Sequence, residues 1–159
     1  MTYDKLQPGR YFFNCKSINV ILLHSLKGVF CRYDSTSRKM LHLVEPWVTY
    51  GVPSKQMVSE LIHKRGYCKV DGKRTALSDN TIVEKVLGEK TEGAVICVED
   101  LIHEIYNVGE EFQKSNSFLW TFHLVAPRSK FQKEKLDYKD GGDYGDRGEE
   151  MDDLIRQML

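Results

Sequence analysis

Residues 54–77 read SKQMVSELIHKRGYCKVDGKRTAL, and this stretch decides the fold class. Its first half has apolar residues at helical spacing after an N-capping serine, which predicts a helix over residues 55–65. Its second half has two short strand-like runs on either side of Asp71 and Gly72, a pair favoured in two-residue hairpin loops. The stretch therefore predicts a helix followed by a β-hairpin over residues 67–77, as expected of an α+β protein.

Four segments precede this stretch. Residues 11–15 (YFFNC) and 29–33 have the composition of strands, whereas residues 18–26 (INVILLHSL) are expected to be helical. Residues 36–51 predict a further helix, bent by Pro46, with apolar residues recurring at every third or fourth position. Its inward face would consist of Met40, Leu41, Val44, Trp47 and Val48.

Further elements are predicted after the hairpin. They are a short helix ending at Gly88 with Ile82, Val83, Val86 and Leu87 inward, a strand over residues 95–98, a helix over residues 99–108, and a short amphipathic helix over residues 152–159. We expect one aromatic cluster to be buried against the helix at residues 99–108. Its members would be Phe118, Trp120, Phe122, Leu101 and Ile105.

The composition changes after Pro127. Residues 128–150 are rich in charged residues and glycine, and this favours an extended segment outside the core, ordered only on a partner. Gly141, Gly142 and Gly145 would let it run close to that partner. We therefore divide the chain into a core over residues 1–53, a helical lobe with the hairpin over 54–127, and a tail over 128–159.

With 159 residues, of which 41% are hydrophobic, the chain suits one globular domain with a real core. None of its apolar runs approaches the roughly 20 residues that cross a bilayer. Four widely spaced cysteines (Cys15, Cys31, Cys68 and Cys97) form no paired motif, so we expect buried free thiols and neither a zinc site nor disulfides.

The net charge is zero, but the charges are segregated along the chain. Residues 51–76 carry six basic and two acidic side chains, whereas residues 77–123 carry three and nine. Five cations lie around the hairpin and the helix end before it, namely Lys64, Arg65, Lys69, Lys73 and Arg74. Two interpretations stay open: an ordinary solvated hairpin, or a surface that follows a phosphate backbone while Tyr67 stacks on a base or sugar. A second basic stretch contains Arg128, Lys130, Lys133, Lys135 and Lys139.

Motifs for catalysis are missing from the sequence. It has no GxSxG, GxxxxGK or GxGxxG pattern, and the glycine-rich residues 140–145 do not follow a strand. Glu99, Asp100, His103 and Glu104 could hold a metal, but we interpret them as the solvated face of a helix. The histidines at positions 24, 42, 63 and 123 show no spacing that suggests a site. We therefore expect no catalytic residue, metal or cofactor.

Several motifs resemble a known family. They are KRGY (64–67), LSDN (77–80), ICVEDLIHEIYNVG (96–109), NSFLW (116–120), GGDYGDR (141–147) and LIRQM (154–158). Together they resemble the eukaryotic L-seven branch of the universal ribosomal protein L-thirty family, from about Gly28 to Leu159. Two departures accompany the likeness. Residues 1–27 match poorly, as if diverged or truncated, and the basic N-terminal arm usual in the family is lacking, which would account for the neutral net charge.

The resemblance implies a ferredoxin-like core, an appended helical lobe with a hairpin, and a tail that lies along RNA. It implies a structural, non-enzymatic constituent of the large (60S) subunit, in contact with ribosomal RNA and neighbouring ribosomal proteins, in the cytoplasmic ribosome after nucleolar assembly. The alternative is a related assembly factor on precursor subunits. The expected RNA contacts are Lys55, Lys64, Arg65, Tyr67, Lys69, Lys73, Arg74, Arg128, Lys130, Lys133 and Lys135.

Overall fold

The computed structural model describes residues 18–24, 26–127 and 136–159. A five-stranded sheet with strand order β6-β2-β1-β3-β7 forms its centre, and its strands are antiparallel except for the parallel pair β3–β7. The strands are β1 (Ile18–His24), β2 (Lys27–Tyr33), β3 (Thr49–Gly51), β6 (Phe122–His123) and β7 (Gly145–Gly148). Together with the helices they confirm the predicted α+β class.

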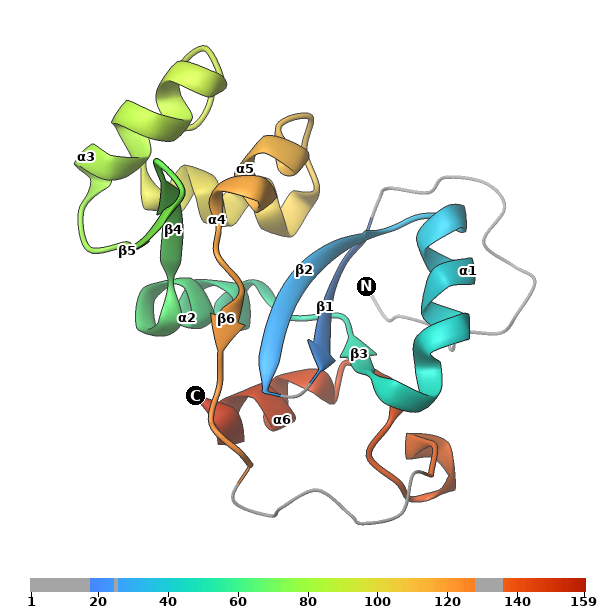
Figure 1. Ribbon diagram of the computed structural model, residues 1–159. Helices are drawn as coiled ribbons and strands as arrows, with labels where there is room; N and C mark the ends of the chain where they lie inside the picture. Colours follow the sequence, from blue (N-terminus) through green and yellow to red (C-terminus); the bar gives the residue numbers. More distant parts are fainter. Residues whose placement is uncertain (1–17, 25, 128–135) are drawn as a thin grey trace.

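The helices and a small second sheet surround this centre. The helices are α1 (Ser35–Val44), α2 (Lys55–Arg65), α3 (Asn80–Val83), α4 (Val98–Asn107), α5 (Phe112–Phe118) and α6 (Met151–Met158), with short turns η1 (Glu45–Trp47), η2 (Glu84–Gly88) and η3 (Tyr138–Asp140). Strands β4 (Tyr67–Val70) and β5 (Lys73–Ala76) form the predicted hairpin. In Figure 1, the hairpin gathers with α3, α4 and α5 at one end of the molecule, far from α1.

The main core lies between one face of the sheet and helices α2, α4 and α6. Ile21, Leu23 and Phe30 point into it from β1 and β2, and Phe122 joins them from β6 with its ring centroid 5.4 Å from that of Phe30. The helices contribute Met57, Val58, Leu61, Ile62, Leu101, Ile102, Ile105, Met151, Leu154, Ile155 and Met158. Most of the apolar burial that stabilises the fold is therefore on this side of the sheet.

Residues 18–24 form a strand, so the expected helix over residues 18–26 is wrong. Pairing along the whole of β2 outweighs the ambiguous periodicity, and β-branched residues suit a strand. The strand expected at residues 95–98 is also absent, because Cys97 caps α4 with its side chain and the helix begins at Val98. The short helix does not end at Gly88 but continues to Lys90 after the π-helical turn. The strand expected at residues 11–15 lies outside the described residues.

The helix expected over residues 36–51 is shorter than predicted. It ends at Val44, because Pro46 lacks the N–H group that an α-helix needs, and residues 49–51 form strand β3. Of the expected inward face, Leu41 in α1 and Val48 after it are buried, while Met40 is 62% and Trp47 57% exposed. Helix α1 thus packs on the sheet through a narrow contact.

The C-terminal part of the predicted tail belongs to the fold. Strand β7 pairs with β3, with Thr49 opposite Gly145, 96 residues later in the chain, and α6 buries four side chains in the core. The close approach predicted for the glycines is made to the chain itself: a Cβ on Gly142 would meet the Leu136 carbonyl. The expectation of an extended segment is therefore wrong for residues 145–148. The boundaries proposed at residues 53 and 127 stay predictions.

Two smaller expectations about burial need correction. Trp120 is only partly buried, whereas Phe118, Phe122, Leu101 and Ile105 are buried as predicted. Of the three described cysteines, all free thiols, only Cys68 is buried. Burial raises the pKa of the Cys68 and Cys31 thiols above the ordinary value.

Candidate nucleic-acid interface

The β4–β5 hairpin has the tight turn that its sequence predicts. Asp71 and Gly72 have φ values of 48° and 77°, the two positive angles of a type I′ turn. One face of the hairpin packs inward through Cys68, whose side chain is fully buried. The backbone of Cys68 forms an isolated antiparallel β-bridge with Leu119. The backbone N–H of Trp120 also donates to the Tyr67 carbonyl at 2.8 Å. The hairpin is therefore held firmly against the end of α5.

The outer face of the hairpin carries the functional side chains. Tyr67 is opposite Ala76 and Lys69 is opposite Arg74, so these residues point to the same side. The guanidinium of Arg74 lies 3.7 Å from the centre of the Tyr67 ring, a cation–π stack that orients it. Lys69 and Arg74 are like charges on directly opposed positions, an arrangement that is unfavourable unless an anion lies near both.

The cations at the end of α2 are less available than the sequence suggests. The Lys64 ammonium lies 2.9 Å from the Glu60 carboxylate, and this hydrogen bond holds the pKa of Glu60 below its ordinary value. Arg65 donates to the main-chain oxygen of Leu159 at 2.5 Å, which ties α2 to the end of α6. Arg65 therefore already has an internal partner.

The remaining expected contacts do not join the hairpin. Lys55 is exposed at the first turn of α2, nine residues before Lys64 and thus roughly 14 Å away along the helix. The last four expected contacts, Arg128, Lys130, Lys133 and Lys135, lie outside the described residues. The structure thus brings Tyr67, Lys69 and Arg74 together on the outer face of the hairpin. Lys73 is exposed beside the turn, but it is opposite Val70 and therefore starts from the other face.

Three residues that the sequence did not single out lie side by side on the central sheet. Lys27 pairs with His24 on β1 and with His123 on β6. All three side chains are exposed. The two histidines look scattered in the sequence because they are 99 positions apart. Strand register brings them together, and no local spacing signals this.

The acidic group at the start of α4 has a structural role. The Cys97 side chain, and with it the Ile96 and Cys97 backbone N–H groups that donate to the Asp100 carboxylate, holds the pKa of Asp100 below its ordinary value. Glu104 accepts from the Glu111 N–H at 2.7 Å. In the described part of the chain, no three His, Cys, Asp or Glu residues are grouped so that they could hold a metal ion.

The glycine-rich motif over residues 141–147 is also used internally. The Arg147 guanidinium lies 2.8 Å from the Asp143 carboxylate and 4.5 Å from the centre of the Tyr138 ring. The Thr49 hydroxyl donates to the Asp143 carbonyl at 2.6 Å, and the Gly145 N–H donates to Val48. These contacts tie the motif to Val48 and Thr49 at the start of β3.

Among the helices that the structure describes, none has the length and apolar character to cross a membrane.

Comparison with known proteins identifies relatives for most of the chain. It is 48% identical over 138 residues, 86% of its length, to a Neurospora crassa protein named large ribosomal subunit protein uL30. A Tetrahymena thermophila protein of the same name is 46% identical over 132 residues, 83% of the chain. Each match covers 54% of the relative, so the chain spans about half the length of the curated relatives it matches. No family model matches. With such identity over most of its length, the chain belongs to the family of large ribosomal subunit protein uL30.

Proposed function

We propose that this chain is a structural, non-enzymatic constituent of the large ribosomal subunit and that it binds ribosomal RNA through the β4–β5 hairpin. The observation that carries the proposal is the outer face of the hairpin, where Tyr67, Lys69 and Arg74 point the same way. Asp71 is the sole acidic residue between positions 67 and 77. Family membership supplies the context, and the ribosome, with neighbouring ribosomal proteins, is the corresponding location.

Each side chain of the hairpin has a distinct part in this proposal. Lys69 and Lys73 neutralise phosphates as flexible point charges. Arg74 donates hydrogen bonds to phosphate oxygens from an orientation held by the Tyr67 ring, and the open part of that ring packs on a sugar or base. A phosphate between Lys69 and Arg74 would remove the repulsion between the two cations.

The test is a salt titration with deproteinised large-subunit ribosomal RNA. Replacing Lys69, Lys73 and Arg74 by Ala should lower the slope of log affinity against log salt by roughly 2, because each lost phosphate contact removes about 0.7–0.9. A control variant with Arg32, Arg38 and Lys39 replaced by Ala makes the same change in net charge at exposed positions around α1, away from the hairpin. Equal slopes for the two variants would contradict the assignment.

Sedimentation tests the assignment to the subunit. We expect the chain to travel with mature large subunits and polysomes. An assembly factor would appear on precursor particles alone, and an enzyme unrelated to ribosomes would stay at the top of the gradient.

A further inference from the structure

The row of His24, Lys27 and His123 crosses three strands at one end of the central sheet. Directly opposed residues in antiparallel strands point to the same face, so the register directs all three side chains to one side. Neighbouring strands are about 4.8 Å apart, and the row is therefore roughly 10 Å long. Its residues are exposed on that side.

The sheet holds this row rigidly. Gly28, next to Lys27, is buried and opposite Phe122, and the Leu124 N–H donates to the Leu26 carbonyl at 2.9 Å. Leu26 has a φ of 65°, as suits the tight turn between β1 and β2. Backbone pairing thus sets the spacing of the three side chains. A ligand that binds here has less protein conformation to order than one that binds flexible loops.

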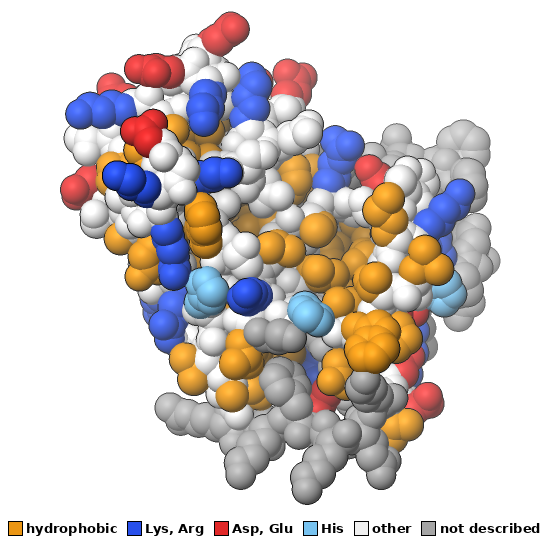
Figure 2. All heavy atoms as spheres, viewed as in Figure 1, with side chains coloured by type: hydrophobic (Ala, Val, Ile, Leu, Met, Phe, Trp, Pro, Cys, Tyr) orange, Lys and Arg blue, Asp and Glu red, His pale blue; other side chains and the backbone are white. Residues whose placement is uncertain are grey.

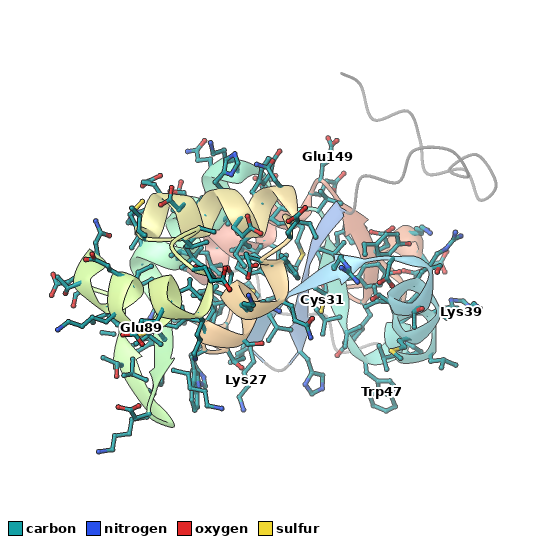
Figure 3. The ribbon with its side chains drawn as sticks, turned by 90° about the horizontal axis from the view of Figure 1, so that it is seen from above. Lys27, Cys31, Lys39, Trp47, Glu89 and Glu149 are labelled. Atoms are coloured by element: carbon teal, nitrogen blue, oxygen red, sulfur yellow. The ribbon has the colours of Figure 1, made fainter. Side chains whose placement is uncertain are left out.

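The charge around the row favours an anionic ligand. Strands β1, β2 and β6 contain no Asp or Glu, and Lys27 forms no ion pair within the described residues. Figure 2 shows a Lys or Arg side chain between two His side chains near the middle of this face, with hydrophobic side chains around them, while the lobe above carries Lys and Arg intermixed with Asp and Glu. In Figure 3, Lys27 projects to the side opposite Glu149.

We propose that His24, Lys27 and His123 form a second binding site for the RNA phosphodiester backbone, which continues the surface of the hairpin across the sheet. Lys27 neutralises a phosphate, and the flanking imidazole N–H groups donate to phosphate oxygens. In the sequence, the second basic stretch begins at Arg128, five residues after His123. The site rests on the proposed function, because it extends the same RNA-bound surface.

The experiment compares Lys27→Ala with Arg32→Ala in the full chain, by salt titration against deproteinised large-subunit ribosomal RNA. Arg32 is an exposed cation on the same strand but on its opposite face. Lys27→Ala should lower the salt slope by about 0.7–0.9, and Arg32→Ala should leave it unchanged. Replacing His24 and His123 together by Ala should weaken binding as well. Thermal unfolding midpoints equal to that of the parent chain would show that the variants fold.

The outcomes separate this site from the hairpin. If Lys27→Ala leaves the slope unchanged while the hairpin triple variant lowers it, the second site is wrong and the proposed function stands. If Lys27→Ala affects retention in assembled subunits but not binding to bare RNA, an acidic protein occupies the row, and the RNA assignment is overturned. If the parent chain binds no ribosomal RNA and does not sediment with large subunits, both proposals fail together.

Discussion

At the scale of the residue, the Arg65 side chain links the end of α2 to the end of α6. The sequence places it beside Lys64 in a cationic run, whereas its guanidinium lies 2.5 Å from the Leu159 main-chain oxygen and is only partly exposed. Arg65→Ala should therefore lower the free energy of unfolding by about 1–2 kcal/mol while changing the RNA salt slope little. Urea titration and the RNA salt titration give the two readouts.

Lys64→Ala is the matched comparison for this prediction. It removes an exposed ion pair with Glu60 that solvent screens, so the free energy of unfolding should fall less than in Arg65→Ala. A loss of salt slope without a loss of stability in Arg65→Ala would instead identify Arg65 as a phosphate ligand.

Asp34 gives a prediction for pH at the same scale. The backbone N–H groups of Ser37 and Thr36 donate to its carboxylate at the start of α1, and these bonds hold its pKa below the ordinary 3.8. A group with a lower pKa in the folded state stabilises the fold above its unfolded pKa, and that contribution is lost as the pH falls through the folded value. The free energy of unfolding should therefore fall less steeply below about pH 4 in Asp34→Asn than in the parent chain.

Asp79 provides the control for this pH dependence. It precedes α3 as an N-cap residue but makes no capping hydrogen bond with its side chain. In Asp79→Asn, the free energy of unfolding should fall with decreasing pH as it does in the parent chain, as measured by urea titration over the same pH range. If the two variants behaved alike, the capping bonds of Asp34 would not be the source of the effect.

At the scale of the element, α1 has one buried side chain, that of Leu41. Leu41 is 6% exposed, whereas Leu43, two residues later, is 79% exposed. Leu41→Ala should cost roughly 2–4 kcal/mol in unfolding free energy, while Leu43→Ala should stay within about 0.5 kcal/mol of the parent chain. Thermal or urea unfolding of the two variants checks this directly, and comparable losses would show that α1 packs through a broader face.

At the scale of the whole molecule, the C-terminal segment completes both the sheet and the core. The Gly145 N–H donates to Val48 and the Val52 N–H donates to Gly148, each at 2.9 Å, while Ile155 is fully buried. We expect the amides of β7 and α6 to be protected from hydrogen exchange in the free chain, almost as strongly as those of β1. Fast exchange throughout residues 145–158 in the absence of RNA would show that this segment orders only in the ribosome.

The local signals in the sequence determined much of the fold and part of the candidate site. Helix α2, its capping serine and the hairpin with its Asp71-Gly72 turn were predictable, because each depends on interactions within about four residues. The placement of Lys69 opposite Arg74 followed from the hairpin alone.

Only the tertiary structure decided which distant segments meet. It paired β7 with β3, gave Arg65 its bond to Leu159, and aligned Lys27 between two histidines 99 residues apart. These arrangements depend on strand register and on how all the apolar faces are buried together, and no short window of sequence carries that information. Helix α1 shows that a local pattern can also mislead. Its apolar residues at helical spacing indicate which side chains share a face, but not whether another element covers that face.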